Sequence, residues 1–271
     1  MTEPPKLLVP ASHNVVVPTV YGPMIVNRHA GEYDMMAKCG RSLTHADIEI
    51  VCTLAWCCGP DSLVIDVGAC FGTYTLALAK LLAPIGGRVM SFEPQMWLYQ
   101  CMTGSLALND ISNVDSRPYA VGAASGIVTV PGLDYTKTAS FGSLPILEFA
   151  DDTSYGDIGQ EVDHERSVQV PMIAIDDLHV RPSLIKIDTE GMELEVLKGA
   201  EGTISRNRPV IYFEHIKSDK DALVAWVEAR DYQTYVNGCD YACLPREKRE
   251  RFPQFEYEPE RVTERVGVFG G

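Results

Sequence analysis

Between residues 62 and 108, short apolar runs alternate with stretches in which apolar residues have helical spacing. The run Ser62–Val67 is apolar, rich in β-branched residues and too short for a helix, so it predicts a buried parallel strand. Thr73–Leu82 has the apolar spacing of a helix, Arg88–Phe92 that of a second strand, and Met96–Leu108 that of a second helix. Strands alternating with helices are typical of a parallel sheet joined by right-handed crossovers.

The later part of the chain repeats this alternation. Ser183–Asp188 and Pro209–Phe213 each predict a strand, and each is followed by a stretch with helical spacing. The expected fold is therefore a doubly wound, mostly parallel α/β sheet with helices on both faces. The other predicted elements are a helix at Thr44–Trp56, a strand at Val114–Val121, and helices at Met192–Lys198 and Asp221–Arg230. The predicted units are a strand-and-helix extension packing on the core (1–60), the core (61–240) and a C-terminal tail (241–271).

One long insert, at about residues 130–168, interrupts the alternation before the strand that ends at Asp188. It has no helical period, and its segment Glu148–Glu165 contains seven acidic residues and no lysine or arginine. A structureless segment of this length in a compact domain is usually functional or disordered. Two interpretations stay open: a solvated acidic loop, or a lid over the mouth of a cofactor site.

Charge narrows the classes of partner. The formal net charge is −14, from 37 acidic and 23 basic residues, which disfavours a nucleic acid or an anionic membrane surface as the main partner. No apolar run is long enough to span a bilayer, and the N-terminus does not resemble a signal peptide, so we expect a cytoplasmic protein. The eight cysteines are interpreted as reduced, mostly buried thiols.

The turn after the first core strand carries the candidate chemistry. It reads D-x-G-x-x-x-G, with Asp66 before the turn, Gly68 where the backbone can approach a ligand, and Gly72 at the start of the helix. Dinucleotide enzymes use G-x-G-x-x-G for a pyrophosphate, beside which an acidic strand end is unfavourable. The next strand ends at Glu93, a carboxylate that can accept ribose hydroxyls. The pattern therefore favours S-adenosylmethionine over NAD.

Three blocks extend this pattern into a family resemblance. They are Val64–Tyr74, then Val89–Pro94, and Ile185–Ala200, whose sequence IKIDTEGMELEVLKGA is the most specific. Together with PVIYFE at 209–214 they make the chain similar to the FkbM family of S-adenosylmethionine-dependent methyltransferases. Cys70 departs from the family, which more often has Asn there. The resemblance implies a class I methyltransferase (Rossmann-like) fold that uses S-adenosylmethionine and releases S-adenosylhomocysteine.

The resemblance also implies which residues meet the cofactor. Those after the first strand would line its methionine part, and those after the second and third would hold the ribose and adenine. Simpler roles stay open at three positions, with Asp66 as a loop acceptor, Thr73 as a helix cap and Glu93 as a surface carboxylate. The expected cofactor contacts are Asp66, Gly68, Ala69, Gly72, Thr73, Tyr74, Glu93, Pro94, Ala120 and Asp188.

Catalytic candidates lie at the ends of the later strands. A hydroxyl acceptor is a poor nucleophile at neutral pH, so a general base or a metal usually assists. We assign the catalytic roles to Asp188, Glu190 and His215, and Glu214 is a further candidate base. Two carboxylates two residues apart suit acid–base work, or could hold a divalent cation with Glu214 or His215, although no metal ligand is predicted. Glu193 is interpreted as a solvated helix residue.

The expected reaction is O-methylation of a hydroxyl on a sugar or natural-product small molecule, a step that rests on the resemblance. No nucleic-acid or membrane partner is expected, and a homodimer is compatible with the sequence. N- or carboxyl-methylation of a small metabolite is the nearest alternative. From other classes, a nicotinamide-dependent oxidoreductase or a non-catalytic scaffold on the same sheet remains open.

Overall fold

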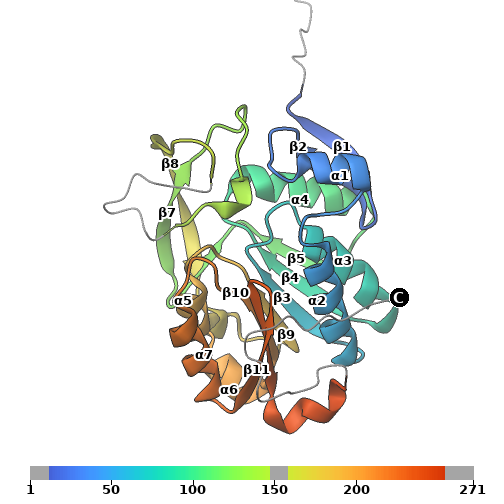
Figure 1. The fold of residues 1–271 in the computed structure, drawn as a ribbon, viewed down its shortest axis with the longest axis vertical. Coiled ribbons are helices and arrows are strands. Elements are labelled where there is room, and N and C mark those ends of the chain that lie inside the picture. Colours follow the sequence, from blue (N-terminus) through green and yellow to red (C-terminus); the bar gives the residue numbers. More distant parts are fainter. Residues whose placement is uncertain (1–11, 147–157, 254–271) are drawn as a thin grey trace, which may run out of the picture.

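The computed structural model describes residues 12–146 and 158–253. Its centre is a seven-stranded sheet in which β12 alone runs against the other strands (Figure 1). The prediction of a doubly wound, mostly parallel sheet is confirmed. In spatial order the strands are β11 (Tyr232–Asn237), β12 (Asp240–Pro245), β10 (Val210–Glu214), β9 (Leu184–Ile187), β3 (Leu63–Val67), β4 (Arg88–Phe92) and β5 (Val114–Arg117).

Helices cover both faces of this sheet because neighbouring strand residues point to opposite sides. Val64 and Leu184 belong to the core of one face, and the next residues, Ile65 and Ile185, belong to the core of the other. The first face carries α2 (His45–Cys57), α3 (Thr73–Leu82) and α4 (Met96–Leu108), and the second carries α5 (Glu193–Lys198), α6 (Glu201–Asn207) and α7 (Lys220–Glu228).

Within the described residues, no helix is both long and apolar enough to cross a membrane.

The described part of the N-terminal extension is a hairpin and a short helix that precede α2. β1 (Asn14–Thr19) pairs with β2 (Gly22–Asn27), and α1 (Tyr33–Cys39) follows. The hairpin packs on α4, where the Ile25 amide donates to the Ser105 hydroxyl at 2.8 Å. A Cβ at Gly104 would lie 2.6 Å from Ile25 Cδ1, so a glycine permits this close approach.

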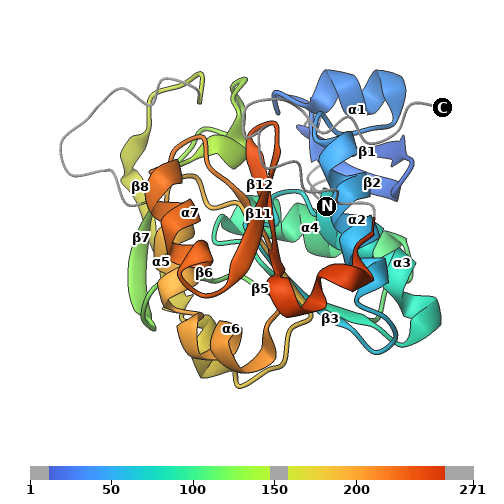
Figure 2. The same ribbon diagram turned by 60° about the horizontal axis from the view of Figure 1, so that its bottom comes forward.

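Strands form both ends of the insert, whereas the sequence predicted a structureless segment throughout. β6 (Ala120–Val121), β7 (Gly126–Gly132) and β8 (Asp163–Ile173) form a second sheet in the order β6-β8-β7. The single strand predicted at Val114–Val121 is thus divided between two sheets. Figures 1 and 2 show β7 and β8 beside α5. Most of the acidic segment, up to residue 157, lies outside the described residues.

The C-terminal boundary differs from the prediction. Residues 240–245 form β12, which lies inside the sheet between β10 and β11, so they do not belong to a tail. The turn from β11 into β12 contains Gly238 with φ +61°, a conformation that favours glycine. Consequently the start of β12 reaches the same edge of the sheet as the ends of the parallel strands.

Candidate functional site

The site lies where the strand order reverses. The chain leaves β3 toward β4 on one side, whereas β9 pairs with β3 on the other, which makes this edge the topological switch point. Gly68 leaves β3 with φ +76°, and a Cβ there would overlap the Asp188 carbonyl oxygen at the exit of β9. The two loops are therefore in backbone contact, and only glycine fits at position 68.

A pocket opens beside this contact. It is bounded by the exits of β3, β4 and β9, by the β5–β6 connection and by the first part of the insert. Gly68, Glu93, Pro94, Ala120, Asp188 and Glu190, all named from the sequence, are among the residues that line it. The remaining lining residues are Val67, Phe92, Gln95, Tyr119, Val121, Gly142, Leu144, Ile146, Thr189 and Met192.

Glu93 is a buried carboxylate in the wall of this pocket. It accepts hydrogen bonds from the backbone amides of Cys70 and Gln95, each at 2.8 Å. Burial raises the pKa of Glu93 to about 7, although these two amides favour the ionised form. A carboxylate has about four acceptor positions, so capacity remains for ribose hydroxyls. Cys70 has φ +51°, a conformation that suits the Asn found more often in the family.

Five expected cofactor residues lie beside the pocket rather than in its lining. Gly72 has φ +86°, and a Cβ there would lie 2.6 Å from Met102 Cγ, so this glycine serves the packing of the turn on α4. The side chain of Asp66 is fully buried, and it accepts a hydrogen bond from the Thr75 hydroxyl at 2.6 Å. The five residues are Asp66, Ala69, Gly72, Thr73 and Tyr74.

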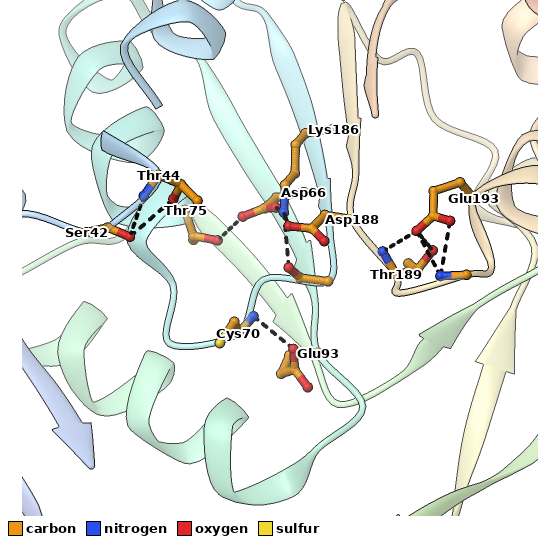
Figure 3. Close-up of polar contacts among 12 residues, drawn as sticks. Ser42, Thr44, Asp66, Cys70, Thr75, Glu93, Lys186, Asp188, Thr189 and Glu193 are labelled. Carbon is orange, nitrogen blue, oxygen red and sulfur yellow. Dashed lines mark hydrogen bonds and ion pairs between the residues drawn. The ribbon is translucent and has the colours of Figure 1, made fainter. Parts of the chain in front are cut away.

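A lysine that sequence reasoning missed lies next to Asp66. Lys186 Nζ is 3.4 Å from Asp66 Oδ1 and 3.3 Å from Asp188 Oδ2, and its side chain is 3% exposed (Figure 3). Burial alone lowers the pKa of Lys186, but the carboxylates of Asp188 and Asp66 outweigh it and raise the pKa overall. A charged residue in the middle of the apolar strand LIKI is the signal that could have identified it.

Three carboxylates meet at the rim of the pocket. Asp188, Glu190 and Glu214 each offer an oxygen, and these oxygens lie within 4.8 Å of one another. Burial and the neighbouring carboxylates raise the pKa of Glu190 to about 7 and that of Glu214 to about 9. Oxygen ligands of this kind could hold a hard divalent cation, or one carboxyl could exchange a proton with a substrate.

His215 is not part of this group. Its backbone amide donates to the Cys239 carbonyl at 3.0 Å, and its ring packs against Tyr241 with 4.7 Å between the ring centres. The start of β12 instead brings Asp240 near the carboxylates. Burial, followed by the charges of Asp47 and Asp188, raises the pKa of Asp240 to about 7. Sequence reasoning examined only the ends of strands and therefore missed Asp240.

Comparison with known proteins identifies the chain. The family model of the methyltransferase FkbM domain matches residues 66–234. The chain belongs to the FkbM methyltransferase family. The class I methyltransferase fold expected from the sequence is thereby confirmed.

Individual relatives of this FkbM methyltransferase are distant. Methyltransferase sdnD of Sordaria araneosa is 27% identical over 160 residues, which are 52% of this chain and 61% of the relative. The crystal structure of methyltransferase FkbM from Methylobacillus flagellatus KT is 20% identical with a TM-score of 0.46, covering 68% of this chain and 43% of that one. A Pyrococcus abyssi tRNA (uracil-54, C5)-methyltransferase in complex with S-adenosyl-L-homocysteine is 11% identical with a TM-score of 0.44, covering 86% and 44%.

Glu193 of the FkbM methyltransferase is 1% exposed, so its interpretation as a solvated helix residue was wrong. Its carboxylate accepts hydrogen bonds from the Thr189 amide at 2.8 Å, from the Thr189 hydroxyl at 2.9 Å and from the Gly191 amide at 3.1 Å. The Ser218 hydroxyl donates to the same carboxylate. Glu193 thereby holds a loop in which Glu190 has φ +57° and Gly191 has φ +109°.

The described part of the insert packs over the pocket of the FkbM methyltransferase. Gln95, in the pocket wall, donates from Nε2 to the Phe141 carbonyl at 2.7 Å and accepts at Oε1 from the Tyr135 hydroxyl at 2.9 Å. A Cβ at Gly142 would lie 3.1 Å from Cys70 Sγ, so the insert touches the turn after β3. The first part of the insert thus contributes directly to the pocket.

Proposed function

We propose that this FkbM methyltransferase binds S-adenosylmethionine in the pocket at the exits of β3, β4 and β9, and methylates a hydroxyl oxygen of a small molecule. The acceptor class is a sugar or a natural-product scaffold. One observation carries the proposal: Glu93 forms one wall of the pocket, and Asp188 and Glu190 line the same pocket at its carboxylate-rich rim. A ribose-binding acceptor and candidate proton acceptors therefore share one cavity.

Several lining residues would hold the cofactor in this proposal. Glu93 would accept the ribose hydroxyls, since its carboxylate retains unused acceptor positions. Pro94 and Ala120, which also line the pocket, would contact the adenine. Gly68 and the rim would meet the methionine part, where the negative charge of Asp188 suits the sulfonium and ammonium groups.

Methyl transfer then requires orientation and a proton acceptor. Bound S-adenosylmethionine would supply the methyl group, which the acceptor oxygen would take in line as the sulfur–carbon bond breaks and the electron pair stays on sulfur. Fixing the two reactants can supply about 7–11 kcal/mol of such a barrier. The hydroxyl proton passes to a rim carboxylate, and Glu190 suits this role best because its pKa is raised to about 7. Asp188 and Glu214 are the other candidates in this group, and His215 is a candidate outside it.

Isothermal titration with S-adenosylhomocysteine tests the cofactor site. The wild-type chain should bind, and Glu93→Ala should bind at least tenfold more weakly because the ribose loses a charged acceptor. Glu195→Ala is the matched control, since this half-buried carboxylate on α5 pairs with Lys198 and does not line the pocket. No binding by the wild-type chain at millimolar ligand would refute the cofactor assignment.

Formation of S-adenosylhomocysteine tests the acceptor and the base. Hydroxylated sugars and polyketide-like alcohols should be methylated, whereas single-stranded and double-stranded nucleic acids should not. Once an acceptor is found, Glu190→Gln should lower kcat at least a hundredfold, and parallel assays of Asp188→Asn and His215→Ala, with and without a chelator, assign the remaining roles. Binding without turnover of any acceptor would indicate a non-catalytic scaffold.

One observation favours an amine as a second candidate acceptor. Mutual repulsion contributes to the raised pKa values of Glu214 and Asp240, after burial itself, so the rim holds an excess of acidic groups. An ammonium group would relieve that repulsion, and its deprotonation by a rim carboxylate would produce the nucleophile. Faster turnover of amines than of matched alcohols would select N-methylation.

A further inference from the structure

Lys186 has no role in the function proposed above, yet its ammonium group touches both loops of the site. Nζ donates to the Gly68 carbonyl oxygen at 3.1 Å, in the turn after β3. It also pairs with Asp66 within β3 and with Asp188 at the exit of β9. The ammonium also lies over the Tyr74 ring, with 4.6 Å between Nζ and the ring centre.

The register of the sheet explains this arrangement. Asp66 and Lys186 are directly paired positions of β3 and β9, so their side chains point to the same face. Asp188 lies two residues beyond Lys186, which directs its side chain toward that face as well. From α3, Thr75 donates to the second oxygen of Asp66, as Figure 3 shows. The sheet therefore places the lysine beside both carboxylates, and α3 contributes the Tyr74 ring against the ammonium and the Thr75 hydroxyl that holds Asp66.

From these contacts we propose that Lys186 is a positioning residue for methyl transfer. It holds the Gly68 turn and Asp188 in the relative placement that the methionine end of the cofactor requires. The proposal rests on S-adenosylmethionine occupying the pocket described above. Asp188 is 31% exposed and lines that pocket, so a buried cation acts on the cofactor through a residue that can touch it.

Charge supports this role as well as geometry. One lysine is shared by two carboxylates, so Asp66, Lys186 and Asp188 together carry one net negative charge. Asp66 is fully buried, and Asp188 borders the pocket. The uncompensated charge is therefore available to the cationic end of the cofactor, while Lys186 prevents Asp188 from turning away from its place at the exit of β9.

A simpler role for Lys186 is compensation of the buried Asp66, and a paired substitution separates the two roles. Lys186→Met alone leaves Asp66 buried without a cation and should destabilise the fold strongly. Adding Asp66→Asn removes that charge, so the double variant Asp66→Asn/Lys186→Met should recover the Tm of Asp66→Asn. We expect its affinity for S-adenosylhomocysteine to stay at least tenfold below that of Asp66→Asn, because the turn and Asp188 are no longer held together.

Equal affinity of the double variant and Asp66→Asn would overturn the proposal, since Lys186 would then only compensate charge. A double-mutant cycle adds a readout that a merely structural role would not move. If Lys186 acts through Asp188, the effect of Lys186→Met on affinity should shrink severalfold in an Asp66→Asn/Asp188→Asn background, and an undiminished effect would contradict the proposal. Lys198→Met, which removes a surface pair with Glu195, should change neither Tm nor affinity. Absence of binding by the wild-type chain would instead refute the cofactor site.

Discussion

Lys217 donates to the Ser143 carbonyl oxygen at 2.6 Å and so joins the insert to the loop after β10. The same ammonium lies 2.9 Å from Glu190 Oε2, at the rim of the pocket. Lys217 therefore connects the segment over the cofactor pocket with the candidate base. Because Gly142 and Leu144 flank Ser143 and line the pocket, this contact should slow the release of a bound cofactor.

Loss of the Lys217 contact should be measurable without an acceptor. A charged hydrogen bond contributes about 1.5–3 kcal/mol, so Lys217→Met should accelerate dissociation of S-adenosylhomocysteine about tenfold in stopped-flow measurements. In the same variant, backbone amide hydrogens of the segment around Ser143 should exchange with solvent faster than in the wild-type chain. The matched control is Lys220→Met, at an exposed position on α7. Unchanged dissociation in Lys217→Met would show that the insert does not retain the cofactor.

Binding of S-adenosylhomocysteine should depend on pH through Glu93. Its folded pKa is raised to about 7, so the carboxylate that we propose as the ribose acceptor becomes protonated below that pH. Affinity should therefore fall below pH 7, approaching about tenfold per pH unit, as expected for release of one proton on binding. Titrations from pH 8 to 5.5 would measure this slope. Glu93→Gln should bind more weakly and without the slope, whereas Glu195→Gln should retain it.

Stability should fall with rising pH because of Glu214. Its pKa is raised from 4.5 to about 9, mainly by burial and then by Asp188, so the folded chain holds a proton that the unfolded chain releases. Stabilisation from this proton is complete below pH 4.5 and is lost as pH rises through 9. Thermal denaturation should show a declining Tm from pH 6 to 9.5, with Glu190 and Asp240 contributing near pH 7.

Glu214→Gln isolates that contribution. At pH 9 this variant should melt above the wild-type chain, by about 2–4 °C for each kcal/mol recovered, and the difference in Tm should shrink steadily as the pH falls toward 4.5. Glu228→Gln, at an exposed position on α7, should leave the profile unchanged. A wild-type Tm that is flat between pH 6 and 9.5 would contradict the raised pKa of Glu214.

Because of the backbone contact at Gly68, we expect this position to tolerate no residue other than glycine. Gly68→Ala places a Cβ on the Asp188 carbonyl oxygen and forces an L residue into a positive φ, which alone costs about 1–2 kcal/mol. We expect loss of binding to S-adenosylhomocysteine together with a marked fall in Tm. Gly126→Ala is the matched control, because no atom lies within 4 Å of its added Cβ. Wild-type binding by Gly68→Ala would show that the two loops can separate freely.

The first half of the core was predictable because its signals are local. The helix bounds Thr73–Leu82 and Met96–Leu108 and the strand Arg88–Phe92 agree with the structure, since each is a continuous apolar run or a clear helical period. The pocket residues after these strands followed from the rule that ligands bind at carboxyl ends of parallel strands. Sequence could not show that Asp66 faces a lysine, because that pairing depends on the register between β3 and β9.

The strands that the sequence did not predict depend on pairing between distant segments or on a hairpin turn. β7 pairs with β8 across a long separation in sequence, and its short polar–apolar alternation was too weak to reveal a strand. The pair Asn237–Gly238 is a recognised hairpin signal, yet the expectation of parallel strands obscured it. Glu193 was assigned to solvent because its partners, Thr189 and Ser218, meet it only after the chain folds.

Because β12 runs antiparallel, the pocket edge of the sheet combines two kinds of connection, which should tolerate substitution to different degrees. The side where we propose that the cofactor binds is formed by turns such as the one at Gly68, whose backbone geometry admits few substitutions. On the side where we propose that the acceptor binds, Asp240 comes from an antiparallel hairpin, and no atom lies within 4 Å of a Cβ added at Gly238 in its turn. Insertions or grafted residues in this turn can therefore alter which acceptors are accepted while the cofactor site stays intact, which makes it a natural place to redirect this methyltransferase.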